Sequence, residues 1–180
     1  MILFSGDSIV NGFPYRRTQS FPSIIERELG VTVYNEGRNG ETAAQLSRYF
    51  LREVKRLKPD MVFIMTGSND VMEVGVTAEG VAETILEMAD GAAKLGAEVV
   101  LMTSIDNDPV LASQRWMRGV DYVRANNLLS EIGTILKDSE YTVIDTGTLY
   151  RECGEYTDGV HPTPAGYRFI ADIIMNGNYI

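Results

Sequence analysis

The amino-acid sequence predicts an α/β fold with three layers, α/β/α, in which helices cover both faces of a parallel sheet. Short apolar runs of β-forming residues alternate with longer helical patterns along the whole chain of 180 residues. The apolar runs are continuous rather than alternating, which is typical of parallel strands that are buried on both faces. Repeated strand–helix units imply right-handed crossovers, and these place all the strands in one sheet.

Five strands are predicted, each an apolar run of four to seven residues. Their bounds are Ile2–Ser5, Val31–Glu36, Met61–Gly67, Glu98–Ser104 and Tyr141–Asp145. Five strands suit the flavodoxin-like order 2-1-3-4-5. In that arrangement a ligand site lies outside the carboxyl ends of the strands, at the switch point beside the first strand.

Each predicted strand is followed by a pattern with apolar residues at i, i+3 and i+4, as an amphipathic helix requires. These helical patterns cover Ser20–Leu29, Glu41–Leu57, Thr77–Leu95, Val120–Lys137 and Thr163–Met175. The last helix also has a recognisable start, since Thr163 is a suitable N-cap and Pro164 suits the first helical position.

Composition limits the class of protein. No repeat, low-complexity tract or linker interrupts the chain, so residues 1–180 are expected to form one domain. The formal charge of −9 argues against nucleic acid and anionic membranes as partners. No apolar run approaches the ~20 residues that cross a bilayer. The N-terminal "MILFSGDS" lacks the basic and apolar regions of a signal peptide, so a cytoplasmic location is expected.

Cys153 is the only cysteine and His161 the only histidine. An intrachain disulfide, a thiolate zinc site and an HExxH motif are therefore all excluded. We expect neither a metal ion nor a cofactor.

Four polar clusters point to one site, because each follows a predicted strand. "SGDSIVNG" follows the first strand, "EGRNGET" the second, "TGSND" the third and "YTDGVHPTP" the fifth. The carboxyl ends of parallel strands meet at one edge of the sheet, so these clusters are expected to lie together there.

The clusters contain the groups that acyl transfer needs. Ser8 is a candidate nucleophile where the first strand gives way to a loop, and His161 is a candidate base. Asp158 lies three residues before His161, and a tight turn through Gly159 would let it fix the imidazole tautomer. Three donors are candidates for an oxyanion hole: the N–H groups of Ser8 and Gly40 and the side chain of Asn69.

Together, "GDS", the glycine of "NGET", "GSND" and "DGVHPTPAGY" resemble the SGNH hydrolases, the GDSL-type esterases and lipases. The resemblance spans almost the whole chain, with "GDSI" in place of the frequent "GDSL". It implies ester hydrolysis through a Ser8–His161–Asp158 triad and an acyl-enzyme, with Gly40 and Asn69 completing the oxyanion hole. G-x-S-x-G does not occur around Ser8, which excludes the nucleophile elbow of the α/β-hydrolases.

The expected substrate is a small acyl ester with a short acyl chain, including acetyl groups on a carbohydrate. The stretch Ile105–Gly119 is predicted to be irregular and is the one segment long enough to form a lid. In it, Trp116, Arg115 and Arg118 are candidates for a substrate wall. Alternatively, Trp116 packs within the domain or at a subunit interface. The sequence does not indicate whether the chain forms a homo-oligomer.

Other functions stay open. The same site suits an acyl thioesterase or lysophospholipase, and the same scaffold suits a non-catalytic carbohydrate-binding module. A flavin-binding protein is a further option, although no stretch reads as a phosphate-cradling loop. A metal-dependent phosphoesterase would leave Ser8 and Asn69 without a role. Its ligands would be Asp7, Asp70, Asp158 and His161.

Overall fold

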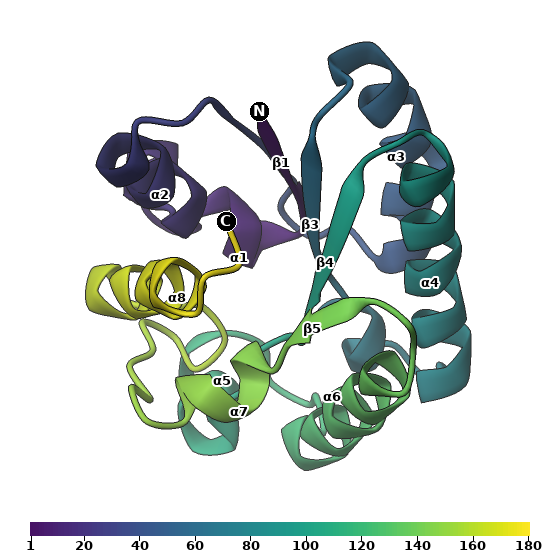
Figure 1. Ribbon diagram of the computed structural model, residues 1–180. Coiled ribbons are helices and arrows are strands. Elements are labelled where there is room, and N and C mark those ends of the chain that lie inside the picture. Colours follow the sequence, from purple (N-terminus) through teal and green to yellow (C-terminus); the bar gives the residue numbers. More distant parts are fainter.

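The computed structural model describes residues 1–180 and contains a five-stranded parallel sheet of order β2-β1-β3-β4-β5 (Figure 1). This confirms the predicted fold class and strand order. The strands are β1 (Ile2–Gly6), β2 (Val33–Gly37), β3 (Met61–Met65), β4 (Glu98–Met102) and β5 (Thr142–Ile144).

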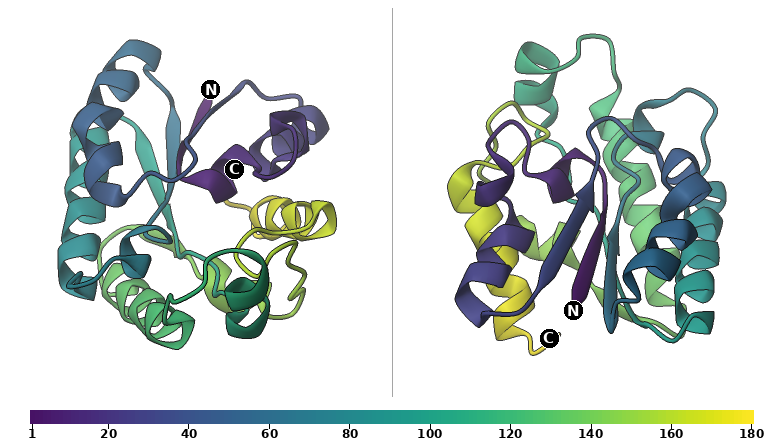
Figure 2. Two further views of the ribbon diagram at one scale, coloured as in Figure 1. Left: turned by 180° about the vertical axis from the view of Figure 1, so that it is seen from behind. Right: turned by 90° about the horizontal axis from the view of Figure 1, so that it is seen from above.

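Helices form a layer on each face of the sheet, as Figures 1 and 2 show. On one face lie α3 (Ala43–Leu57), α4 (Ala78–Lys94) and α6 (Tyr122–Lys137). On the other lie α1 (Ser8–Asn11), α2 (Phe21–Leu29), α7 (Thr146–Tyr150) and α8 (Pro164–Asn176). One further helix, α5 (Pro109–Arg115), projects beyond the carboxyl ends of the strands in the right-hand view of Figure 2. Two short 3₁₀ turns complete the chain, η1 (Arg17–Gln19) and η2 (Asp70–Met72).

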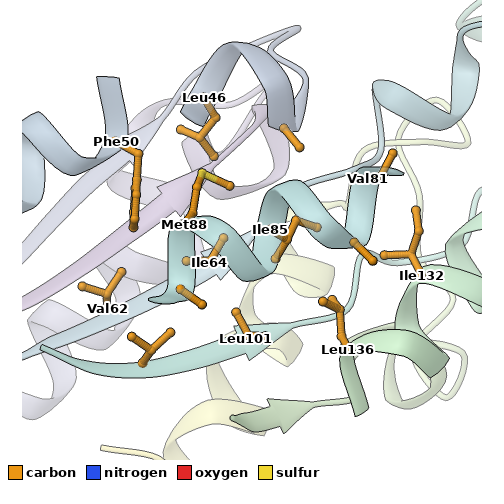
Figure 3. Close-up of a cluster of buried hydrophobic side chains, with 14 of the residues drawn as sticks. Leu46, Phe50, Val62, Ile64, Val81, Ile85, Met88, Leu101, Ile132 and Leu136 are labelled. Carbon is orange, nitrogen blue, oxygen red and sulfur yellow. The ribbon is translucent and has the colours of Figure 1, made fainter. Parts of the chain in front are cut away.

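Two hydrophobic clusters hold the layers together, because alternate residues of each strand point to opposite faces. Ile64 and Leu101 belong to the cluster beneath α3, α4 and α6, where Phe50 and Met88 pack against the sheet (Figure 3). Phe63, on the neighbouring position of β3, belongs to the cluster beneath α2 and α8. The continuously apolar strands are thus buried on both faces, as the sequence predicts.

The start of the last helix also agrees with the prediction. The Thr163 hydroxyl accepts a hydrogen bond from the Gly166 N–H at 3.1 Å, and Pro164 is the first residue of α8.

The prediction of an irregular segment over Ile105–Gly119 is wrong, because that segment contains α5. Asp108 caps this helix by accepting hydrogen bonds from the N–H groups of Val110 and Leu111, at 3.0 and 2.9 Å, and Pro109 occupies its first position. The helix has only seven residues, which is too short for a clear apolar period. None of the helices combines the length and the apolar character that crossing a membrane requires.

Candidate active site

Ser8 lies just beyond the carboxyl end of β1, as the first residue of α1 rather than in a loop. Asp7 is the N-cap of this helix, and its Oδ1 accepts a hydrogen bond from the Ile9 N–H at 2.9 Å. Gly6 lets β3 approach closely, since a Cβ there would lie 2.0 Å from the carbonyl oxygen of Met65. Ser8 is therefore fixed in position, because it lies between the end of β1 and the first turn of a capped helix.

Asp158 and His161 lie in a tight turn that Asp158 itself organises. Its Oδ1 accepts hydrogen bonds from the backbone N–H groups of Val160 and His161, at 3.0 and 2.8 Å. Gly159 has a φ of 93°, and a Cβ at that position would lie 2.2 Å from the backbone nitrogen of Ala112. Only glycine fits this turn without strain or collision.

The turn brings the three predicted residues into one hydrogen-bonded chain. His161 Nδ1 lies 2.8 Å from Asp158 Oδ2, and His161 Nε2 lies 3.0 Å from Ser8 Oγ. Burial alone would raise the pKa of Asp158, but the hydrogen bonds from the ring and backbone N–H groups of His161 and from the Val160 N–H lower it overall. An ionised carboxylate only accepts, so Nδ1 carries the proton and Nε2 is free to accept the proton of the Ser8 hydroxyl.

Of the three candidate oxyanion donors, Ser8 begins α1, whereas Gly40 and Asn69 lie on two loops that are joined by a hydrogen bond. Gly40 follows β2 with a φ of 77°, and neither its N–H nor that of Ser8 donates a hydrogen bond within the protein. The Asn69 side chain donates to the carbonyl oxygen of Glu41 at 2.9 Å, which leaves its second N–H available. The loop after β3 is therefore fixed to the residue that follows Gly40.

Two aromatic rings contact His161, and the sequence predicted a role for only one of them. The rings of Trp116 and Phe13 each lie 4.7 Å from the imidazole, centroid to centroid, in edge-on geometry. Trp116 is 40% exposed, so its contact is with the site rather than with the core. Phe13 was missed, although it follows "SGDSIVNG" directly.

The side chains of Arg115 and Arg118 make no polar contact with the residues of the site. Both side chains are exposed, and neither makes a hydrogen bond or an ion pair. Of the predicted substrate wall, only Trp116 is in contact with the triad residues.

Asp7 and Asp70 are buried carboxyl groups beside the site. Asp70 accepts hydrogen bonds from the Ala43 N–H at the start of α3, at 3.1 and 3.0 Å. Asp7 Oδ2 has no hydrogen-bond partner, and neither has the hydroxyl group of Ser68. The Ser68 hydroxyl is close enough to lower the pKa of Asp7. No group of three or more potential metal ligands forms around these carboxylates, which removes the geometric support for a metal-dependent phosphoesterase.

Ionisation of Asp7 is expected to reduce the stability of the fold. Burial raises the pKa of Asp7 from 3.8 to about 6, against the lowering effect of the Ile9 N–H, the Ser68 hydroxyl and His161. The folded protein therefore favours the neutral carboxyl group of Asp7. This contribution to stability is fully present below pH 3.8, the ordinary pKa of aspartate, and it is lost as the pH rises through about 6. The full loss corresponds to roughly 3 kcal/mol.

The Asp7→Asn variant lacks this titration. Its free energy of unfolding, relative to that of the wild type, should rise by about 2 kcal/mol between about pH 4.5 and pH 7.5. Urea unfolding at both pH values measures this difference, in which all other titrating groups cancel. A constant difference would mean that Asp7 is ionised without cost, through a partner such as a buried water molecule.

The fold and this set of contacts define a class of protein: a hydrolase of three-layer α/β/α fold, with a serine, a histidine and an aspartate in one hydrogen-bonded chain. A family model gives the particular family. The model of the GDSL-like lipase/acylhydrolase family matches residues 4–169. The chain belongs to this family and is a hydrolase that acts on esters. No match was found among curated proteins.

Solved structures share the whole fold. A lipase/acylhydrolase from Enterococcus faecalis has a TM-score of 0.80 at 23% identity, covering 98% of this chain and 93% of its own. A lipolytic protein of the G-D-S-L family from Veillonella parvula has a TM-score of 0.79 at 20% identity, covering 99% and 97%. An acetylxylan esterase from Geobacillus stearothermophilus has a TM-score of 0.77 at 22% identity, covering 97% and 92%. At these identities the likeness concerns the fold alone.

Proposed function

We propose that this protein is a serine esterase that hydrolyses small, short-chain acyl esters through an acyl-enzyme on Ser8. One observation carries the proposal: the continuous hydrogen-bonded chain from Ser8 Oγ through the imidazole of His161 to Asp158, with distances of 3.0 and 2.8 Å. Such an arrangement supports the assignment of Ser8 as nucleophile, His161 as base and Asp158 as the group that orients the base.

In the proposed reaction, Ser8 Oγ attacks the ester carbonyl carbon while its proton passes to His161 Nε2. The negative charge that develops on the carbonyl oxygen is stabilised by the N–H groups of Ser8 and Gly40 and by the Asn69 amide. The imidazolium then gives its proton to the leaving alkoxide as the carbon–oxygen bond breaks.

Water completes the cycle. A water molecule gives a proton to His161 Nε2 and attacks the acyl carbon, which releases the carboxylic acid and returns the proton to Ser8. Asp158 accepts the Nδ1–H bond throughout and stabilises the imidazolium in both steps.

The surroundings of the site support a short acyl group. Enclosing a long chain needs apolar walls, since each buried CH₂ contributes only about 0.8 kcal/mol. Phe13 and Trp116 are the aromatic side chains beside His161. The helix that borders this region, α5, is capped by the polar Asp108. The fold of an acetylxylan esterase is similar, which makes an acetylated carbohydrate a reasonable candidate.

A series of p-nitrophenyl esters tests this preference. We expect kcat/KM to be highest for acetate or butyrate and to fall for octanoate and palmitate, all measured below their micelle concentrations. Matched acetyl and octanoyl thioesters, in a second arm, address the thioesterase alternative. A tenfold or larger rise from butyrate to octanoate would favour a lysophospholipase or long-chain thioesterase. Failure to hydrolyse any ester would favour a carbohydrate-binding module.

A further inference from the structure

An open depression of about 440 Å³ borders the candidate oxyanion hole. It lies between the loop after β2 and the first turns of α3, and Gly40 is part of its lining. The lining is mostly polar and includes two guanidinium groups, those of Arg38 and Arg48, together with the side chains of Asn39 and Gln45. The catalytic proposal does not use this depression.

Hydrogen bonds fix the depression next to the proposed nucleophile. The backbone N–H of Arg38 donates to the carbonyl oxygen of Gly6 at 2.9 Å, at the end of β1. The Asn11 side chain, in the same helix as Ser8, donates to Asn39 Oδ1 at 2.7 Å. If the carbonyl oxygen of a substrate lay at the Gly40 N–H, the groups next to that carbonyl would therefore reach the depression.

Arg38 is held in place with its donors largely free. Its guanidinium lies 3.9 Å above the centre of the Tyr49 ring, a cation–π arrangement. The Tyr49 hydroxyl in turn donates to the carboxylate of Glu41, which itself lines the depression, and this hydrogen bond orients the ring. The remaining acidic neighbour, Glu36, lies 3.6 Å from Arg38 without a hydrogen bond and is shared with Arg56.

The Arg48 side chain makes no hydrogen bond and no ion pair, and it is exposed in the first half of α3. The chain as a whole carries a formal charge of −9, so two guanidinium groups beside one depression, only one of them in an ion pair, contrast with its general charge. Planar guanidinium groups bind carboxylates and phosphates through paired N–H donors.

We propose that this depression binds a negatively charged group of the ester substrate, so that the enzyme prefers esters that carry a carboxylate or a phosphate near the scissile bond. An acyl ester of an acidic sugar or of a hydroxy acid has this chemistry. The inference deepens the proposed function and depends on it, because it assigns the part of the substrate that lies beyond the oxyanion hole.

Two matched pairs of esters test the proposal and locate the anion. Phenyl acetate and 4-acetoxybenzoate differ by a carboxylate on the alcohol side. The p-nitrophenyl ester of hexanoic acid and the mono-p-nitrophenyl ester of adipic acid differ by a carboxylate on the acyl side. In at least one pair, we expect kcat/KM to favour the anionic ester about tenfold at low salt, and we expect high salt to reduce that ratio.

Single-residue variants distinguish anion binding in the depression from a general effect of positive charge on the protein surface. Arg48→Gln and Arg38→Gln are each expected to lower the anionic-to-neutral ratio about five- to tenfold. Arg52→Gln is the matched control, because Arg52 lies one turn further along α3, pairs with Glu53 and does not line the depression. The control should leave the ratio unchanged.

Ratios near one in both pairs, or equal effects of Arg48→Gln and Arg52→Gln, would overturn the proposal. Calorimetric titration of 4-acetoxybenzoate and adipate monoamide into Ser8→Ala protein gives a readout without turnover. Anion binding that Arg48→Gln weakens would support the depression even if no ester were hydrolysed, whereas hydrolysis without anion preference would leave the proposed function intact and remove this inference.

Discussion

The Ser8→Ala variant is expected to lose ester hydrolysis by about 10⁴-fold or more while it keeps its fold. The loss is large because the serine, the histidine and the aspartate act as a unit, so that removing the nucleophile removes the acyl-enzyme route altogether. The fold should survive because the Ser8 hydroxyl makes a single hydrogen bond, to His161, whose net contribution to stability is about 1 kcal/mol.

The measurement is kcat/KM for p-nitrophenyl acetate, together with a thermal unfolding curve. Ser5→Ala is a suitable control, since Ser5 is a buried serine of β1 that makes no hydrogen bond with His161. Activity in Ser8→Ala above a trace, with the control at wild-type level, would mean that another residue is the nucleophile.

The Asp158→Asn variant is expected to lower kcat by about 10²- to 10⁴-fold. The asparagine oxygen can keep the hydrogen bonds from the backbone N–H groups of Val160 and His161, so the turn should retain its shape. Its NH₂ group would then face His161 Nδ1 and donate to it. That contact favours the tautomer with the proton on Nε2, which cannot accept the proton of Ser8.

The Asp158→Ala variant distinguishes the two roles of Asp158, which are to orient the His161 ring and to hold the turn. It removes the backbone acceptor as well, so it should unfold at a lower temperature than Asp158→Asn while both variants lose activity. If Asp158→Asn kept wild-type kcat, a backbone carbonyl or another acceptor would be orienting His161. The assignment of Asp158 as the orienting group would then be wrong.

The fold could be predicted because its signals are local and repeated. Continuous apolar strands and amphipathic helices fix the alternation, and the handedness of crossovers then limits the topology. The site could be located for the same reason. Ser8 and His161 are 153 residues apart, yet both follow strands whose carboxyl ends share one edge. Their contact in the structure agrees with the prediction, and their catalytic roles stay proposals.

Other features depend on packing that no local pattern records. The helices α5 and α7 contain seven and five residues, too few for a clear period, so the sequence indicates neither helix and predicts an irregular segment over Ile105–Gly119. The contacts of Phe13 and Trp116 with His161 join parts of the chain that are distant in sequence. The unpartnered oxygen of Asp7 also becomes visible only when its neighbours are in place.

Arg115 shows the limit of inferring a role from position alone. It lies next to Trp116 in the sequence, but it is exposed at the end of α5 and has no polar partner. Trp116 follows the last residue of α5 with non-helical φ and ψ, so its side chain and that of Arg115 do not share a helix face. Proximity in sequence to Trp116 is therefore insufficient to predict that Arg115 contacts the site.

The central proposal is that Ser8 is the one nucleophile, activated by His161. The most direct test is to treat the protein with a serine-directed organophosphonate and to locate the label by mass spectrometry of the digested chain. The account predicts a single adduct, on Ser8, which forms in step with the loss of esterase activity and is absent from Ser8→Ala. An adduct on any other residue, or complete inactivation with Ser8 unmodified, would contradict it.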